Sequence, residues 1–415
     1  MQTQIEAIQK RLSALKNKTS ADPITLEVQE GLINPSDRFH GLDFLRSFAL
    51  LMGVLLHSVS MYLEPSDGSD PRPVAAIIFV WIHTWRMPLF MLLAGFFTAL
   101  SLTNRTNSEF FVNRIIRLGT PLLLLWLIIP HVDESTVPMF QLPDMIAYFL
   151  TDKPPSFRLD HLWFLYYLLI LYFIALIAGT FFQSVISYVE GFRSRRVSLL
   201  IFWLPLLWLL STHHKPTGAI FSDVPSNLGE LKIGSFLFLS AFFVIGVQLH
   251  QNRSLIDGFK SKWFYLPSFV VCSIIPVGVM GWGVMKDEPF TFVSPTEMWL
   301  THLIMTMSTI FLVAAFIGFA EKNLTANGRM VNWLVRRSYP IYVFHLIFVY
   351  GVGGYLIRSG WDAVAVVTVS MISGILGPTI IYASVIKHTP LDWVFNGYKH
   401  SKFKLKNNPR FSKYL

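Results

Sequence analysis

The chain has 415 residues, of which 53% are apolar and only 14% are charged. A soluble protein of this length carries about a quarter charged residues, so the composition excludes an ordinary soluble domain. The net charge of +9 does not by itself indicate a nucleic-acid partner, because membrane proteins gather Lys and Arg in their cytoplasmic loops. The single cysteine, Cys272, excludes an intramolecular disulfide and a cysteine-based zinc site.

Ten apolar segments, each close to the roughly 20 residues that cross a bilayer, follow one another along the chain. They fall at about residues 41–62, 75–101, 111–130, 159–183, 197–211, 232–250, 263–284, 297–320, 339–358 and 363–386. With a cytoplasmic N-terminus, the inside segments carry 25 Lys and Arg residues and the outside segments only 7, in agreement with the positive-inside rule. We therefore expect an all-α polytopic membrane protein of about ten transmembrane helices, with both termini in the cytoplasm.

Two smaller segments flank this membrane domain, which we expect over residues 39–390. Residues 1–38 form a cytoplasmic N-terminal extension, and residues 391–415 form a basic cytoplasmic tail interleaved with aromatic residues. A basic tail beside a membrane is typical of contact with anionic lipid, so its expected partner is membrane lipid and not nucleic acid. The sequence is compatible with a homo-oligomer but does not specify one.

The first span carries three ionisable residues, which are functional candidates by default inside a membrane. Arg46 and His57 are eleven residues apart, so they lie within about 20° of one helix face and about 16 Å apart along the axis. Asp43 lies near the same face and suits an i,i+3 pair with Arg46. A structural reading also remains open: Arg46 extends to the interface with Asp43 as its partner, and His57 is a packed, hydrogen-bonded histidine.

The second span places His83 and Arg86 on one face near mid-membrane, two residues before Pro88. Because arginine stays charged, Arg86 must face protein, water or an anion. Further candidates lie at the outer ends of the fourth and eighth spans and in the ninth span: Asp160, His161, Trp163, Glu297, His302 and His345. No metal-binding motif accompanies them, and we expect no metal.

Arginines also gather at the cytoplasmic ends of several spans. They are Arg46, Arg114, Arg117, Arg336 and Arg337. Guanidinium groups bind phosphate through bidentate, charge-assisted hydrogen bonds, so this set suits a cytoplasmic mouth for a phosphorylated ligand. Arginines on the inner side are expected in any membrane protein, and this simpler reading stays open.

Five motifs occur in this order: "LDFLRSFALLMGVLLHS", "WRMPLFMLLAGFF", "NRIIRLGTP", "DHLWFLYYLL" and "SYPIYVFH". From about residue 38 to 390 the chain thereby resembles the acyltransferase-3 family of integral membrane enzymes. Within that family the motifs are closest to the group that succinylates osmoregulated periplasmic glucans with cytoplasmic succinyl-CoA. The chain departs from that group at His345-Leu346, where relatives often carry two adjacent histidines.

The resemblance implies roles for these residues. Arg46 and His57 match the family's Arg-x10-His pair, Arg114 and Arg117 match its Arg-x-x-Arg element, and its other motifs contain Arg86, His161 and His345. The expected protein is a multi-pass enzyme of the bacterial inner membrane. It uses acyl-CoA, most simply succinyl-CoA, as a donor substrate, holds no permanent cofactor, and acylates a hydroxyl of a periplasmic glucan.

In the expected mechanism the arginines at the cytoplasmic mouth bind the donor, and His57 removes the proton of the acceptor hydroxyl. Arg86 stabilises the oxyanion or holds a succinyl carboxylate. Asp160 and Glu297 are candidates to orient His57, and a two-step path through an acylated His57 is also allowed. Two other functions stay open: an acetyltransferase of another envelope glycan, and a proton-coupled transporter or flippase.

Overall fold

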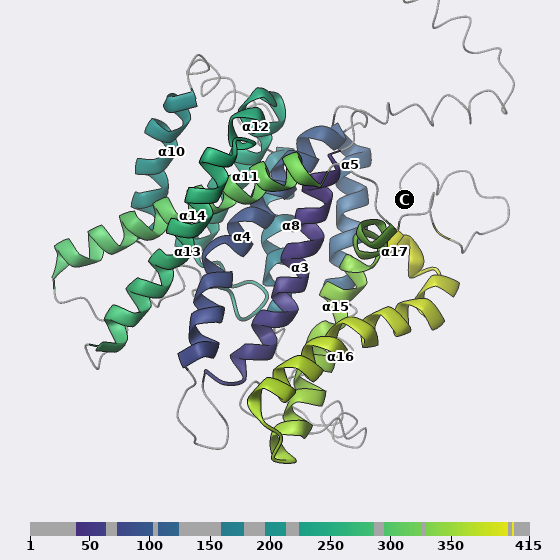
Figure 1. Ribbon diagram of the computed structural model, residues 1–415. Coiled ribbons are helices and arrows are strands. Elements are labelled where there is room, and N and C mark those ends of the chain that lie inside the picture. The colour runs from purple at the N-terminus through teal and green to yellow at the C-terminus, as the bar shows by residue number, and fades with distance from the viewer. Residues whose placement is uncertain are drawn as a thin grey trace, which may run out of the picture. The chain divides into compact units, whose positions relative to one another are not determined.

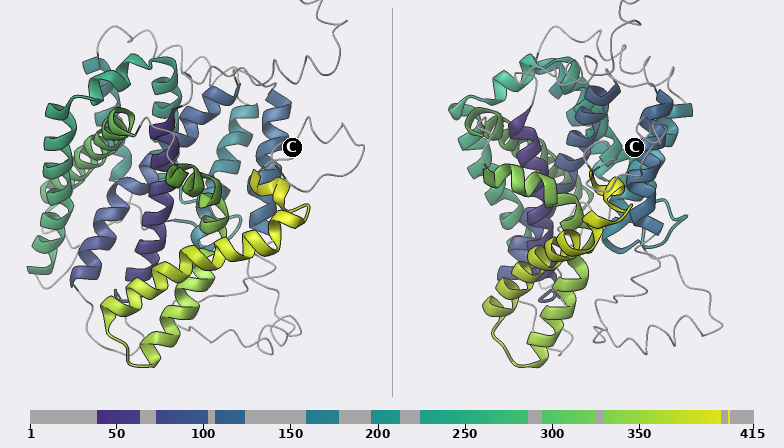
Figure 2. Two further views of the ribbon diagram at one scale, coloured as in Figure 1. Left: turned by 45° about the vertical axis from the view of Figure 1, so that its right-hand side comes forward. Right: turned by 90° about the vertical axis from the view of Figure 1, so that its right-hand side faces the viewer.

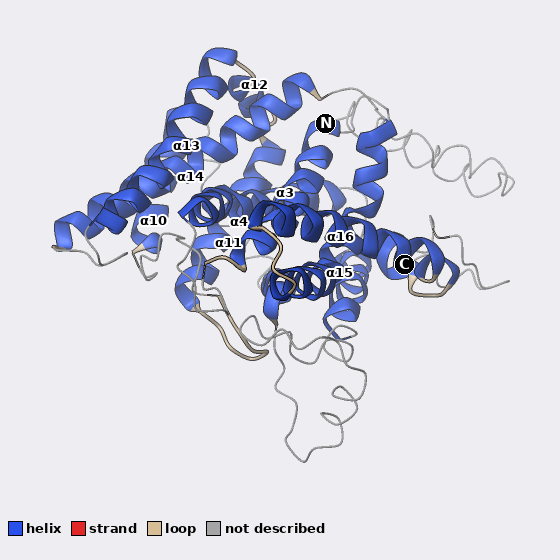
Figure 3. Cartoon of the chain, turned by 60° about the horizontal axis from the view of Figure 1, so that its bottom comes forward, coloured by secondary structure: helices blue, strands red, loops and turns tan. Residues whose placement is uncertain are grey.

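The computed structural model describes residues 39–63, 73–102, 107–123, 159–177, 196–212, 224–285, 294–324, 329–396 and 401. The N-terminal extension expected over residues 1–38 lies outside these ranges, as does most of the predicted tail. Within them the chain forms helices joined by turns, with no β-strand (Figure 3). The predicted all-α class is therefore confirmed for this part of the protein.

Seven of the described helices are long and apolar enough to cross a membrane. They are α3 (His40–Ser60), α4 (Pro73–Leu102), α11 (Ile233–Gln251), α13 (Lys262–Met285), α14 (Pro295–Asn323), α15 (Arg329–Arg358) and α16 (Ala363–Ser384). Each coincides with a predicted span. The protein is thus a multi-pass membrane protein.

The other three predicted spans correspond to shorter elements. Part of the span expected at 111–130 is formed by α5 (Asn107–Arg114) and the π-helix η3 (Ile115–Gly119). The fourth contains the 3-10 turn η4 (Asp160–Leu162) and α8 (Trp163–Ile177), and the fifth is α10 (Arg196–Ser211). The described parts of α8 and α10 have 15 and 16 residues, fewer than the roughly 20 that a perpendicular span needs. The ten-span topology and its orientation therefore stay predictions.

Three helix pairs form most of the packing: α4 with α11, α13 with α14, and α15 with α16. Figures 1 and 2 show α13 and α14 on one side, α15 and α16 on the other, and α3 and α4 between them. Helices α4 and α11 approach closely at two glycines. A Cβ on Gly95 would lie 1.9 Å from the Phe243 carbonyl oxygen, and one on Gly246 would lie 1.9 Å from that of Leu92.

Prolines within the spans remove backbone hydrogen bonds, and at two of these prolines a hydroxyl group of α14 supplies a replacement donor. Pro88 of α4 leaves the Thr84 carbonyl without its helical donor, and the Thr309 hydroxyl of α14 donates to that oxygen at 3.0 Å. Pro276 of α13 has the same effect on the Cys272 carbonyl, which accepts from the α14 hydroxyl of Ser308 at 2.6 Å. These hydrogen bonds give both carbonyl oxygens a donor, which the hydrocarbon of a membrane cannot supply.

The remaining described elements are short and lie near helix ends. They are α12 (Ser254–Phe259), the 3-10 turn η5 (Ile386–His388) and α17 (Asp392–Asn396). Helix α17 contacts both η3 and α15, so the C-terminal part of the described chain packs beside the Arg-x-x-Arg element.

Candidate active site

Three histidines from separate elements meet inside the helix bundle. His57 comes from α3, His161 from η4 and His345 from α15. Their ring centroids lie 5.0 Å apart for His161 and His345, 5.3 Å for His57 and His345, and 6.3 Å for His57 and His161. We call these three residues the histidine cluster.

The His345 ring is held by its own helix. Its Nδ1 lies 3.1 Å from the Ile341 carbonyl oxygen and 2.8 Å from that of Tyr342. Since a carbonyl only accepts hydrogen bonds, Nδ1 carries the proton and Nε2 carries a lone pair. This Nε2 is buried and has no hydrogen-bond partner in the described part of the protein. A buried unpaired nitrogen is costly, which favours a ligand or water opposite it.

His161 is held the other way round, across two elements. Its Nε2 lies 3.1 Å and 3.2 Å from the carbonyl oxygens of Tyr342 and Val343 on α15, so Nε2 is the protonated nitrogen. The Tyr342 hydroxyl in turn donates to the His161 carbonyl at 2.8 Å. Nδ1 of His161 is left with its lone pair and with no partner among the residues that the structure describes.

His57 is partly accessible, whereas His161 and His345 are buried. Ser60 donates its hydroxyl proton to the His57 carbonyl, so the Tyr350 hydroxyl, 3.2 Å away, must donate to Ser60 Oγ. The Tyr350 oxygen, 3.4 Å from His57 Nδ1, then accepts from that nitrogen. This chain of donors assigns the proton to Nδ1 and leaves Nε2 of His57 as a base. The group facing Nδ1 is thus a tyrosine hydroxyl and not a carboxylate.

Arg86 of α4 lies beside the cluster, and only 9% of it is exposed. Its Nη1 approaches α3 so closely that a Cβ on Gly53 would lie 2.1 Å from it. Its charge acts on His57, His161 and His345. No carboxylate of the described ranges lies within ion-pair distance of its guanidinium, and Nε has no hydrogen-bond partner there. A buried cation without an acid suits an anionic substrate group.

The other residues predicted for the site are not among the ring contacts that define the histidine cluster. His83, one turn before Arg86, packs its ring on Phe79 at 4.1 Å. Trp163 is buried against Tyr167, with ring centroids 5.5 Å apart. Glu297 lies in the first turn of α14, and His302 is buried further along the same helix. The contacts that define the histidine cluster include neither of these two. The side chain of Asp160 lies outside the described part of the protein.

The arginines predicted for the cytoplasmic mouth have different neighbours in the structure. Arg46 pairs with Asp43 at 3.6 Å and lies 5.4 Å from the centre of the Phe97 ring. Arg114 lies over Phe110 at 4.8 Å, and Arg337 lies over Trp333 at 4.8 Å. Arg336 is exposed. Cation–π contacts of this kind attract a guanidinium to the face of an aromatic ring.

Arg117 has the most defined partners of this set. Its Nε and Nη2 donate to the carbonyls of Val394 and Phe395, at 3.2 Å and 2.7 Å, at the end of α17. The Tyr339 hydroxyl of α15 donates to the Arg117 carbonyl. Arg117 therefore joins η3, α15 and α17, a structural role that the sequence motif did not indicate.

Two contributors to the site were not predicted as site residues. Gly53 creates the space for Arg86, and Tyr350 assigns the tautomer of His57. The only sequence signal for Tyr350 was a hydroxyl in the otherwise apolar stretch "LIFVYGVGG". Across the described ranges, no three His, Cys, Asp or Glu side chains are arranged to hold a metal ion.

The chain is similar in sequence to known proteins. The curated relatives include proteins named Glucans biosynthesis protein C from Salmonella paratyphi B, Salmonella dublin and Salmonella enteritidis PT4, each 24% identical over 229 residues. The match covers 51% of this chain and 58% of each relative. No solved structure matches significantly. The acyltransferase domain of the acyltransferase-3 family matches residues 39–383, and the chain belongs to this family of membrane acyltransferases.

Proposed function

We propose that the protein transfers a succinyl group from cytoplasmic succinyl-CoA to a hydroxyl of a periplasmic glucan, in the bacterial inner membrane. Membership of the acyltransferase-3 family supports acyl transfer, and the name of the relatives supports a glucan acceptor. The observation that carries the proposal is the histidine cluster: three imidazoles with lone pairs lie beside the buried Arg86.

His57 acts as the general base in this proposal. Its Nε2 takes the proton of the glucan hydroxyl while the hydroxyl oxygen attacks the thioester carbon, and collapse of the intermediate breaks the C–S bond. The proton then passes to the leaving CoA thiolate, so the base is regenerated. Such proton transfer is worth ~10²–10⁴-fold in rate. The Tyr350 hydroxyl holds the ring in the tautomer that this step needs.

Arg86 has two candidate roles, stabilising the oxyanion of the intermediate or binding the free carboxylate of a succinyl group. Its burial without an acidic partner supports either role, because both place a negative charge against the guanidinium. His161 and His345 complete the site as further proton acceptors. His345 lies in the cluster even though the next residue is Leu346 and not a second histidine.

The donor enters from the cytoplasmic side in this proposal, with its phosphates on the arginines of the mouth. Arg114 and Arg117 supply the Arg-x-x-Arg element, and Arg46, Arg336 and Arg337 add to the positive charge. Arg117 also donates Nε and Nη2 to α17, so in this proposal it adds positive charge to the mouth besides joining η3 to α17.

Mass spectrometry of periplasmic glucans tests the proposal in cells that make either the intact protein or His57→Ala. We expect succinyl groups with the intact protein and a loss of at least ~10²-fold in the variant. His388→Ala is the matched control, because this histidine is exposed on η5 and should leave acylation unchanged. Unchanged acylation in His57→Ala would refute the role of His57.

The same experiment separates the alternatives. Acetyl in place of succinyl groups would make the protein an acetyltransferase, and transfer to another envelope glycan would change the acceptor. Transport of unmodified substrate without release of free CoA would identify a carrier. Mass spectrometry of the protein mixed with succinyl-CoA alone tests the two-step path, since an adduct on His57 would contradict the direct mechanism.

A further inference from the structure

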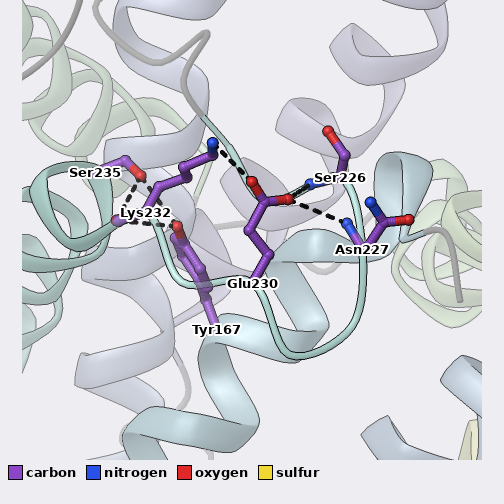
Figure 4. A network of polar contacts seen from close by, with 6 residues as sticks. All are labelled: Tyr167, Ser226, Asn227, Glu230, Lys232 and Ser235. Atoms are coloured by element: carbon purple, nitrogen blue, oxygen red, sulfur yellow. Dashed lines mark hydrogen bonds and ion pairs between the residues drawn. The ribbon is translucent and has the colours of Figure 1, made fainter.

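The segment that contains His161 is held by hydrogen bonds near each of its two ends, and both sets of bonds come from one other stretch of the chain. The carbonyl of Ser226 accepts from the backbone N–H of Leu159 at 2.8 Å. At the other end, the Tyr167 hydroxyl donates to the Lys232 carbonyl at 3.2 Å and lies 3.0 Å from Ser235 Oγ (Figure 4). We call residues 226–235 the clasp and residues 159–167 the clasped segment.

The carboxylate of Glu230 holds the clasp together. Its Oε2 accepts from the backbone N–H groups of Ser226 and Asn227, at 2.8 Å and 3.4 Å. Its Oε1 lies 2.6 Å from Lys232 Nζ. Figure 4 shows this carboxylate between the two ends of the loop. The turn that allows this passes through Gly229, whose φ of 91° favours glycine.

Glu230 is not a core residue, because 32% of its side chain is exposed. The hydrogen bond from Lys232 and those from the backbone hold the pKa of the Glu230 carboxyl below its ordinary value. The group is therefore ionised at neutral pH, the state in which a carboxylate accepts the strongest hydrogen bonds from N–H donors.

The contact between Ser226 and Leu159 lies two residues from the histidine cluster. The Leu159 carbonyl accepts from the Leu162 N–H at 2.7 Å, which closes the 3-10 turn containing His161. The N–H of the same Leu159 is the group that the clasp holds. A shift of the clasp therefore moves the backbone that carries His161, while the ring of His161 is bonded to α15 on its other side.

We propose that Glu230 is a positioning residue: through the Ser226–Leu159 contact, it sets the place of His161 in the histidine cluster. The positional part of this inference depends only on the contacts above. Its consequence for catalysis rests on the proposed function, in which His161 belongs to the reacting site. The two parts are separated by measuring the position of His161 without substrate and the acyl transfer with it.

Chemical labelling of histidine tests the positional part. The full-length protein in lipid nanodiscs is treated with diethyl pyrocarbonate, and the rate of His161 modification is read by mass spectrometry. In the intact protein the ring is buried and should react slowly. In Glu230→Ala we expect a rise of about tenfold, because loss of the N–H acceptor opens the clasp locally, together with faster deuterium uptake by residues 159–167.

Asn227→Ala is the matched control, because the hydrogen bonds between Asn227 and Glu230 involve only the backbone N–H and carbonyl of Asn227, which alanine keeps. It should leave the labelling of His161 unchanged. Glu230→Gln retains an oxygen acceptor and loses the charge, so its rate of His161 labelling should lie between those of Asn227→Ala and Glu230→Ala. It replaces Glu230→Ala if that variant does not fold. Labelling and deuterium uptake equal to those of the intact protein in both Glu230 variants would overturn the proposal.

Kinetics with succinyl-CoA and purified periplasmic glucan test the catalytic part. A displaced His161 should lower kcat by about tenfold and leave the KM for the donor unchanged, because in the proposed function the donor's phosphates are bound by the arginines of the cytoplasmic mouth and not by His161. A raised donor KM with an unchanged kcat would contradict positioning. If labelling of His161 rises while acyl transfer stays normal, the clasp is supported and the role of His161 in the proposed reaction is refuted.

Discussion

The substitution Gly53→Ala tests whether the position of Arg86, and not only its charge, matters for acyl transfer. Gly53 lies on α3, one helical turn before His57, and faces the Arg86 guanidinium of α4. An added Cβ would lie 2.1 Å from Arg86 Nη1 and 3.3 Å from Cζ. The guanidinium is the end of a flexible side chain, so it can move away while both helix backbones stay in place.

The size of the effect follows from these distances. Ordinary van der Waals contact begins at 3.4 Å, so Nη1 must retreat by about 1.3 Å. A misplacement of about 1 Å at a reacting site can cost ~10²-fold in rate, which corresponds to about 2.7 kcal/mol of transition-state stabilisation. Alanine is favoured over glycine in a helix interior by up to about 1 kcal/mol, so α3 itself is not weakened.

Acyl transfer and thermal unfolding are measured on the same membranes for three variants. Gly53→Ala should remain folded and lose ~10²-fold of its activity. Gly278→Ala of α13 should leave acyl transfer unchanged and should not lower the melting temperature, since its Cβ would have no atom within 4 Å. Gly95→Ala should lower the melting temperature and the yield, because its Cβ would lie 1.9 Å from a backbone oxygen that cannot move aside.

A Gly53→Ala protein with normal activity would refute the reasoning, since it would show that the guanidinium tolerates displacement from the cluster. Loss of activity together with loss of folded protein, as expected for Gly95→Ala, would also contradict it. In that case Gly53 would serve helix packing and not the placement of Arg86.

Three further outcomes are expected. Tyr350→Phe removes the acceptor of His57 Nδ1 and should lower the rate of acyl transfer about tenfold without loss of folded protein; an unchanged rate would contradict the assigned tautomer. Arg117→Ala removes the two bonds to the end of α17, so trypsin should cleave the C-terminal tail of the solubilised protein faster than in the intact protein. The stability that the Glu230 carboxylate contributes is present above pH 4.5 and is lost as the pH falls through its lowered pKa. The difference in melting temperature between the intact protein and Glu230→Gln should therefore disappear in acid, and a difference that persists there would argue against a charge effect.

Local sequence pattern predicted much of the helical structure. Seven of the ten predicted spans coincide with long apolar helices, because burying apolar side chains in lipid and satisfying the backbone internally leave little choice but a helix. The same reasoning predicted spans over α8 and α10 as well, and these stay predictions because the described parts of the two helices have only 15 and 16 residues. It also placed Arg46 beside Asp43, a contact within one helix turn.

The ionisable residues that form the site were predicted one by one from the cost of burying charge in a membrane. That argument selects His57, Arg86, His161 and His345 together with residues outside the cluster, such as Glu297 and His302, because periodicity within one helix carries no information about which helices face each other. It left carboxylates as candidates to orient His57, whereas the structure has the Tyr350 hydroxyl at Nδ1. The arginine motif predicted that Arg117 binds a phosphorylated ligand, and the structure shows in addition that this side chain donates a hydrogen bond to α17.

The sequence by itself therefore determined a helical membrane protein, its family motifs and the set of candidate residues, because each of these depends on the chemistry of one segment at a time. The tertiary structure decided which nitrogens of the histidine cluster carry protons, how Gly53 admits Arg86, and how the clasp reaches Leu159. Those features depend on atoms from distant segments lying within hydrogen-bond or van der Waals distance, and only the packed arrangement of the helices brings such atoms together.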